Sequence, residues 1–132
     1  MILKGRKVVG GTAEGEALVS KDPVSFYGGV DPYTGVIREP GHACIGKSVS
    51  GKIFIFPTGK GSTVGSYVIY GMKKQGTSPA AIVNVETEAI IATGCVISSI
   101  PLVDKLEDDP LRIFKTGMRL RVVGDEGLVE TI

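Results

Sequence analysis

The chain has 132 residues, enough for one domain with its own core and too few for two ordinary domains. Its 42% hydrophobic and 22% charged residues are typical of a folded globular protein and exclude a disordered chain. Fifteen basic residues balance 14 acidic ones without forming a basic cluster, which argues against a partner that is nucleic acid or an anionic membrane.

The first half of the chain is expected to be a compact β structure. Segments of alternating hydrophobicity are separated by glycine-rich turns, at KVVGG, EALVS, TGVIRE and KIFIF. The 19 glycines are about twice the usual share of roughly 7%, which suits many short strands joined by tight turns. The stretch GGVDPYTG is expected to be a loop with positive backbone dihedral angles.

Residues 62–75 contain the clearest helical pattern in the chain. Apolar side chains recur there at helical spacing. Ser62 or Thr63 is expected to cap the first turn, and Gly76 is expected to end the helix. The segment AAIVNV, which follows a Ser-Pro break, predicts a buried strand.

The C-terminal part of the chain begins with an ambiguous segment, AIIATGCVISSIPLV. The β-branched side chains of Ile90 and Ile91 favour a strand, whereas residues 94–103 are compatible with a short helix interrupted by Pro101. RIFKTG and then MRLRVVGDEGLVETI predict a strand followed by a hairpin that turns at residues 124–127. The whole pattern predicts a β-rich α/β domain in which strands outnumber helices.

The cysteine content and the amino terminus bear on location and on cofactors. Cys44 and Cys95 form no C-x-x-C pair and are expected to be buried thiols rather than a disulfide. Two thiols and one histidine cannot hold a four-ligand iron-sulfur cluster, so such a cofactor has to come from a partner. The chain shows no signal peptide and no apolar run of roughly 20 residues, so we expect a cytoplasmic protein.

The stretch GHACIGKS, residues 41–48, matches the nucleotide-binding pattern G-x-x-x-x-G-K-[ST]. That loop cradles phosphate only when a buried strand precedes it and a helix follows it. Here the following segment, SVSGKIFIF, alternates as a strand and contains Gly51. We therefore interpret the match as a turn-rich β connection and not as a P-loop.

A second glycine loop, GKGSTVGS at residues 59–66, has the context that the first one lacks. The strand KIFIF leads into it, and the predicted helix begins at its serine. Gly59 and Gly61 permit a tight turn with backbone amides pointing inward, and the helix start adds partial positive charge. Ser62 lies where those donors converge, with Lys60 two residues before it. The loop is either an anion site centred on Ser62 or only a turn and an N-cap.

Several longer stretches resemble one family. They are GEALVS, PVSFYGGVDPYTGVI, the Gly-His pair at residues 41–42, KIFIFPTGKGSTVGSYVIY, SPAAIVNVE and GCVISSIPLVD. They occur in order over most of the chain, and together they are similar to the small subunit, or swivel domain, of the aconitase X group. The resemblance implies one swivelling β/β/α domain over residues 1–132, like the mobile domain of aconitase.

The resemblance also implies a function. The domain would dock on a large aconitase-X-like subunit that holds a [4Fe-4S] cluster, and Ser62 would be the proton acceptor. The implied reaction is the dehydration of (R)-5-phosphomevalonate, a small phosphorylated hydroxy acid, to trans-anhydromevalonate 5-phosphate in the mevalonate route to isoprenoids. Substrate contacts are expected from the glycine loop and its surroundings, at Lys60, Gly61, Thr63, Gly28, Gly29 and His42, and no metal ligand is expected from this chain.

Other interpretations stay open at this point. Relatives of aconitase X also act on other hydroxy acids such as a hydroxyproline. A different class is a non-catalytic binding or carrier domain in which His42 accepts a phosphoryl group. His42 itself is either a structural histidine or a group that orients a substrate carboxylate. Gly28 and Gly29 either line the cleft or form a plain turn.

Overall fold

The computed structural model describes all of residues 1–132 and contains eight strands and four α-helices. The strands are β1 Ile2–Lys4, β2 Arg6–Val9, β3 Thr12–Val19, β4 Ile53–Phe56, β5 Ala81–Asn84, β6 Leu102–Asp104, β7 Arg119–Val123 and β8 Leu128–Thr131. The helices are α1 Phe26–Gly29, α2 Gly65–Gln75, α3 Ala89–Ser98 and α4 Pro110–Ile113, with a 3₁₀ turn at Gly124–Glu126. The prediction of a β-rich α/β fold is confirmed.

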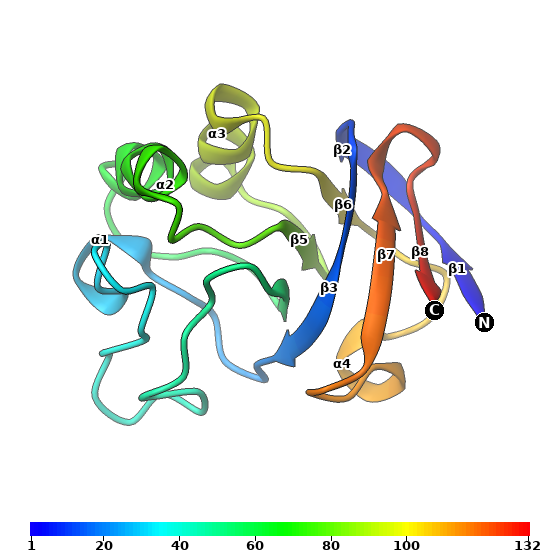
Figure 1. The fold of residues 1–132 in the computed structure, drawn as a ribbon, viewed down its shortest axis with the longest axis horizontal. Coiled ribbons are helices and arrows are strands. Elements are labelled where there is room, and N and C mark those ends of the chain that lie inside the picture. The colour runs from blue at the N-terminus through cyan, green and yellow to red at the C-terminus, as the bar shows by residue number, and fades with distance from the viewer.

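The eight strands form one mixed sheet in the order β1-β8-β7-β3-β4-β5-β6-β2 (Figure 1). Strands β3 to β6 run parallel to one another, and the flanking pairs are antiparallel. The two outermost strands, β1 and β2, are joined through Gly5 alone. With only one residue between them, β1 and β2 must lie close together, although they are the first and last strands of the sheet order. The sheet therefore curls until its two edges meet.

The curled sheet separates two hydrophobic cores, and β4 contributes to both. Phe54 and Phe56 pack with the helices on the outer face, whereas Ile53 and Ile55 point into the space that the sheet encloses. All four side chains are fully buried. Burial on both faces is typical of a central parallel strand, so the four residues of β4, Ile53–Phe56, are all apolar and none is half exposed.

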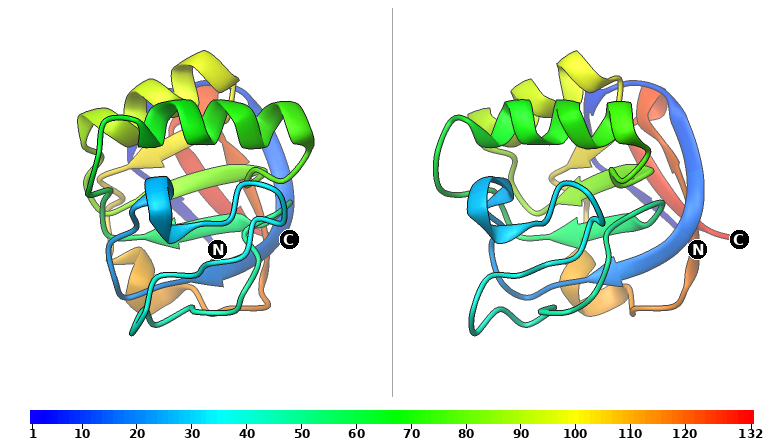
Figure 2. Two further views of the ribbon diagram at one scale, coloured as in Figure 1. Left: turned by 90° about the vertical axis from the view of Figure 1, so that its left-hand side faces the viewer. Right: turned by 60° about the vertical axis from the view of Figure 1, so that its left-hand side comes forward.

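Helices α2 and α3 lie side by side over the outer face of the sheet (Figure 2). Their close approach depends on Gly94 of α3, where an added Cβ would lie 2.7 Å from the Cδ1 of Ile69 on α2. The predicted end of α2 is confirmed, because Gly76 adopts φ 81° and its amide closes the last turn. The predicted start of α2 is wrong, because the first helical residue is Gly65 and neither Ser62 nor Thr63 caps the helix through its side chain.

Three other secondary-structure predictions are wrong. Ile90 and Ile91 belong to helix α3, because Glu88 caps that helix and its packing on α2 outweighs the strand preference of β-branched residues. The segment TGVIRE forms only isolated bridges at Val36 and Ile37. RIFKTG is the end of α4 and a turn, although the hairpin of β7 and β8 that follows it is confirmed.

No helix has both the length and the apolar character needed to cross a membrane.

Candidate active site

The glycine loop lies in the connection between the carboxyl end of β4 and the start of α2, residues 57–64. The carboxyl ends of parallel strands are the usual location of ligand sites in open α/β sheets. A second loop, which follows the parallel neighbour β3, holds this one in place. The Lys60 amide donates to the Val24 carbonyl at 3.0 Å, and the Val24 amide donates to the Thr58 carbonyl at 3.2 Å. The two loops therefore form one continuous edge beside the start of α2.

Glycine is required at two positions of the loop because neighbouring groups approach its backbone closely. At Gly59, an added Cβ would lie 2.2 Å from a carboxylate oxygen of Glu88 and 2.5 Å from a side-chain carbon of Ile91. At Gly61, the φ of +88° lies in the left-handed region, and an added Cβ would lie 2.4 Å from the Ser25 hydroxyl. The loop is thus wedged between the start of α3 and the loop that follows β3.

Ser62 is exposed on this edge. Its hydroxyl oxygen accepts a hydrogen bond from the Val64 amide at 3.1 Å. The amides of Gly61, Ser62 and Thr63 donate no hydrogen bond within the chain, so they are free to bind an external acceptor. Successive free amides after a left-handed glycine, at the positive end of α2, form a setting that favours negative charge. The loop around Ser62 therefore has the unpaired amides that an anion site would need, although α2 starts at Gly65, three residues later than expected.

Lys60 is exposed, and its ammonium lies 2.8 Å from a carboxylate oxygen of Glu39. A cation two residues before Ser62 would support negative charge on that residue. In the structure Glu39 offsets the positive charge of Lys60, and the Ser62 oxygen accepts its hydrogen bond from the backbone amide of Val64. Glu39 also lies against Gly29, where an added Cβ would be 3.3 Å from its carboxylate.

Gly28 and Gly29 end the short helix α1, beside the glycine loop. Gly28 has φ +84° and lines a hollow of about 350 Å³. The first residues of α2 reach this element, because an added Cβ at Gly65 would lie 3.7 Å from the Tyr27 amide. The structure thus places Gly28, Gly29, Lys60, Gly61 and Ser62 on adjoining loops. Thr63 points to the other side, into a groove between α2 and α3.

His42 is buried with 5% of its surface exposed, and both ring nitrogens are engaged. Nδ1 accepts a hydrogen bond from the Cys44 amide at 3.0 Å, which fixes the proton on Nε2. Nε2 then donates to the Pro23 carbonyl at 3.0 Å. This geometry supports the structural interpretation of His42, because neither nitrogen is free to attack a phosphoryl group or to meet a substrate carboxylate.

The cysteines do not form a metal site. Burial raises the pKa of Cys95 to about 12 and also raises the pKa of Cys44 above its ordinary value. A metal ligand has to be a thiolate, which both environments disfavour. No three His, Cys, Asp or Glu side chains gather into a group that could hold a metal ion. The side chains of this chain therefore do not fit an iron-sulfur cluster.

Three residues that shape the loop were not predicted from the sequence. Glu88 caps α3 by accepting hydrogen bonds from the amides of Ile90 at 2.8 Å and Ile91 at 2.9 Å, and its carboxylate also rests against Gly59. Glu39 and Ser25 contact the loop from distant parts of the sequence. Of these three residues, only Glu88 could have been predicted from the sequence, as an acidic N-cap just before an apolar helix. That prediction requires residues 89–98 to be assigned as a helix first.

The family model for the aconitase X swivel domain matches residues 2–131. The chain belongs to the aconitase X swivel-domain family. It is 55% identical to the phosphomevalonate dehydratase small subunit of Methanosarcina acetivorans, over 98% of this chain and 90% of that relative. It is also 55% identical to the subunit of the same name from Thermococcus onnurineus, over 98% of each chain.

The structural comparison agrees with the sequence comparison. A crystal structure of Thermococcus kodakaraensis aconitase X in its holo-form superposes on this swivel domain with a TM-score of 0.95 and 53% sequence identity. The alignment covers 100% of this chain and 98% of the other. The resemblance that the sequence stretches indicated is therefore confirmed at the level of family and fold.

Proposed function

We propose that this swivel domain is the small subunit of a heteromeric hydro-lyase that dehydrates (R)-5-phosphomevalonate to trans-anhydromevalonate 5-phosphate, in a mevalonate route to isoprenoids. The proposal depends on one observation: the chain is about 55% identical in sequence, over nearly its whole length, to relatives named phosphomevalonate dehydratase small subunit. The word "small" in those names implies a larger partner subunit. We place the assembled enzyme in the cytoplasm.

Ser62 is the proposed proton acceptor. Loss of water from a 3-hydroxy acid breaks a C-H bond beside the carboxylate and the C-O bond on the next carbon. A serine hydroxyl accepts that proton only as an alkoxide, which needs strong stabilisation. The Val64 amide already donates to the Ser62 oxygen, and α2 begins with its positive end at Gly65, three residues after Ser62.

Exposure of Ser62 supports the proposal that a second subunit completes the site. In water, hydrogen bonds to solvent compete with the backbone amides and weaken their effect on the oxygen. A protein surface that closes over the loop removes that competition and strengthens the remaining interactions. We therefore propose that Ser62 becomes a base only in the closed complex, and that the free amides of Gly61 to Thr63 then face the substrate.

The second half of the reaction needs a Lewis acid at the departing hydroxyl. An aconitase-like dehydratase uses an iron-sulfur cluster for this, and the side chains of this chain do not fit one. We propose that the large subunit holds the cluster, most simply a [4Fe-4S] cluster. This chain would then contribute the base, the loop amides and part of the closed wall of the site, to which Lys60, Gly28 and Gly29 belong.

The test is Ser62→Ala in the complex reconstituted with the large subunit. The variant is expected to assemble normally, because Ser62 is exposed and its side chain makes one hydrogen bond, from the Val64 amide. The rate of phosphomevalonate dehydration should fall by about 10³-fold or more, the scale of loss when a group that acts directly in the chemical step is removed. Ser50→Ala, at a half-exposed serine in another loop, is the matched control and should retain the rate.

Two results would contradict the proposal. Full dehydration by the Ser62→Ala complex would exclude Ser62 as the base. Turnover of a hydroxyproline in place of phosphomevalonate would keep the reaction type and change the substrate. The carrier alternative has its own test, since it requires label from a phosphodonor to appear on His42, and both ring nitrogens of that residue are already hydrogen bonded.

A further inference from the structure

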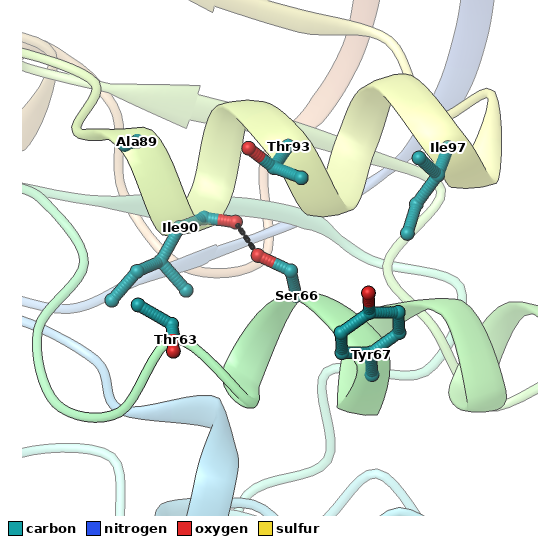
Figure 3. A pocket seen from close by; sticks show the side chains of 7 residues that line it. All are labelled: Thr63, Ser66, Tyr67, Ala89, Ile90, Thr93 and Ile97. Carbon is teal, nitrogen blue, oxygen red and sulfur yellow. Dashed lines mark hydrogen bonds between the residues drawn. The ribbon is translucent and has the colours of Figure 1, made fainter.

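Helices α2 and α3 enclose an open groove of about 410 Å³ on the surface of the domain. Figure 3 shows Thr63 and Ile90 at one end of the groove and Ile97 at the other, with Tyr67 of α2 facing α3 across it. A hydrogen bond of 2.7 Å from the Ser66 hydroxyl to the Ile90 carbonyl ties the two helices together at its floor. The groove is thus a fixed part of the fold.

The exposed surface around the groove is unusually apolar. Tyr67 and Ile97, which line the groove, are 72% and 42% exposed. Val64 and Val96, the chain neighbours of the lining residues Thr63 and Ile97, are 44% and 59% exposed. Helix α3 contains no charged residue over its ten positions. A helix that is apolar on all sides is normally buried on all sides, and contiguous apolar patches on a protein surface mark interaction sites. The free face of α3 therefore lacks a partner in the isolated subunit.

We propose that this groove is the docking surface for an apolar segment of the large subunit. The inference rests on the proposed function, because the closed site requires that subunit to cover Ser62. Thr63 follows Ser62 directly in the chain and lines the near end of the groove. A surface that covers Ser62 and extends past Thr63 lies over the groove without a break. The groove lining contains no charged side chain and its exposed surface is mainly apolar, so the matching segment of the large subunit is apolar.

The experiment measures the dissociation constant between the small and large subunits. Ile97→Glu places a charge at the far end of the groove from Ser62, and it should weaken binding by about tenfold or more, because a buried charge without a partner is costly. Ile97→Ala removes apolar area without adding a charge and should weaken binding by about three- to tenfold. The small-subunit concentration that gives half-maximal activity should rise by the same factors.

The matched control is Ile2→Glu. Ile2 is 52% exposed on β1, away from α2 and α3 (Figure 1), and receives the same change in charge. Circular dichroism and thermal unfolding of each free small subunit establish that the variants are folded. Wild-type affinity of a folded Ile97→Glu variant would overturn the docking proposal. So would a dimer of the free small subunit that Ile97→Glu dissociates, because a second copy would then occupy the groove.

The two proposals fail separately in this design. Binding that weakens with Ile97→Glu, together with full activity of Ser62→Ala, would support the docking surface and overturn the role of Ser62. Unchanged binding of Ile97→Glu, together with loss of activity in Ser62→Ala, would overturn the docking surface and support the base.

Discussion

Gly59→Ala tests whether the glycine loop is held in place by the cap of α3. The added Cβ would lie 2.2 Å from a carboxylate oxygen of Glu88 and 2.5 Å from a carbon of Ile91. Neither neighbour is free to move, because both oxygens of Glu88 accept hydrogen bonds from the first turn of α3 and Ile91 is buried in the core. The substitution must therefore shift either the loop or the helix cap.

The magnitude follows from these contacts. Loss of an N-cap costs about 1 kcal/mol. Overpacking a filled site costs about 1–3 kcal/mol. Together they give a destabilisation of roughly 2–4 kcal/mol, which for a domain of this size lowers the Tm by roughly 10 °C. Urea denaturation and differential scanning calorimetry of the isolated domain measure the two quantities independently.

Gly71→Ala is the matched control for this substitution. Gly71 lies in the middle of α2, and an added Cβ there has no atom within 4 Å. The same substitution should stabilise the domain by about 0.5–1 kcal/mol, because alanine loses less backbone entropy in a helix. Opposite signs at the two glycines are therefore expected. Equal stability of Gly59→Ala and the wild type would refute the reasoning.

A double-mutant cycle separates the contribution of Glu88. Glu88→Ala alone loses the cap of α3. In that background Gly59→Ala meets only the Ile91 side chain, so it should cost less than in the wild type. A coupling energy below about 0.5 kcal/mol would show that Gly59 and Glu88 act independently, and would contradict the contact on which the prediction depends.

Two further predictions concern buried ionisable groups. Burial raises the pKa of Asp104, but hydrogen bonds from Arg6 and the Thr87 amide outweigh it and hold that pKa below its ordinary value. Asp104 therefore stabilises the fold fully above the ordinary aspartate pKa, and this stabilisation is lost as the pH falls through the folded pKa. Urea denaturation as a function of pH should show that Asp104→Asn loses less free energy of unfolding at acid pH than the wild type does. The second prediction concerns the two buried thiols, Cys44 and Cys95, of which Cys95 has a pKa of about 12. Both should resist iodoacetamide in the native domain and react with it in urea. Alkylation of either thiol in the native domain, detected by mass spectrometry, would contradict their burial.

The segment from β4 to α2 was predictable because its signals are local. A run of apolar residues, a glycine loop and a periodic helix that ends at Gly76 follow one another without competing patterns. The start of α2 was missed by three residues. The side chain of Ser62 accepts its hydrogen bond from the Val64 amide and so forms a local turn within the loop. Such a turn and a helix N-cap use the same residue types, so the sequence does not distinguish them.

The neighbours of the loop were not predictable, because they come from distant parts of the chain. Glu39 pairs with Lys60 from 21 residues away, and Ser25 reaches Gly61 from the loop after β3. His42 next to a glycine turn has the same local appearance whether it is catalytic or structural. Two hydrogen bonds favour the structural role. The one from the Cys44 amide is local, whereas the one to the Pro23 carbonyl joins residues 19 apart and depends on tertiary structure.

The misassignment of Ile90 and Ile91 and the groove between the helices have one physical cause. A helix in a monomeric domain normally carries polar residues on its outer face, and that periodicity is what identifies it in a sequence. Helix α3 has no such face, because it lacks charged residues and exposes Val96 and Ile97. A sequence selected to bury both sides of a helix loses the amphipathic signal. The absence of that signal in α3 is therefore what we expect of a helix whose second side is covered by another subunit.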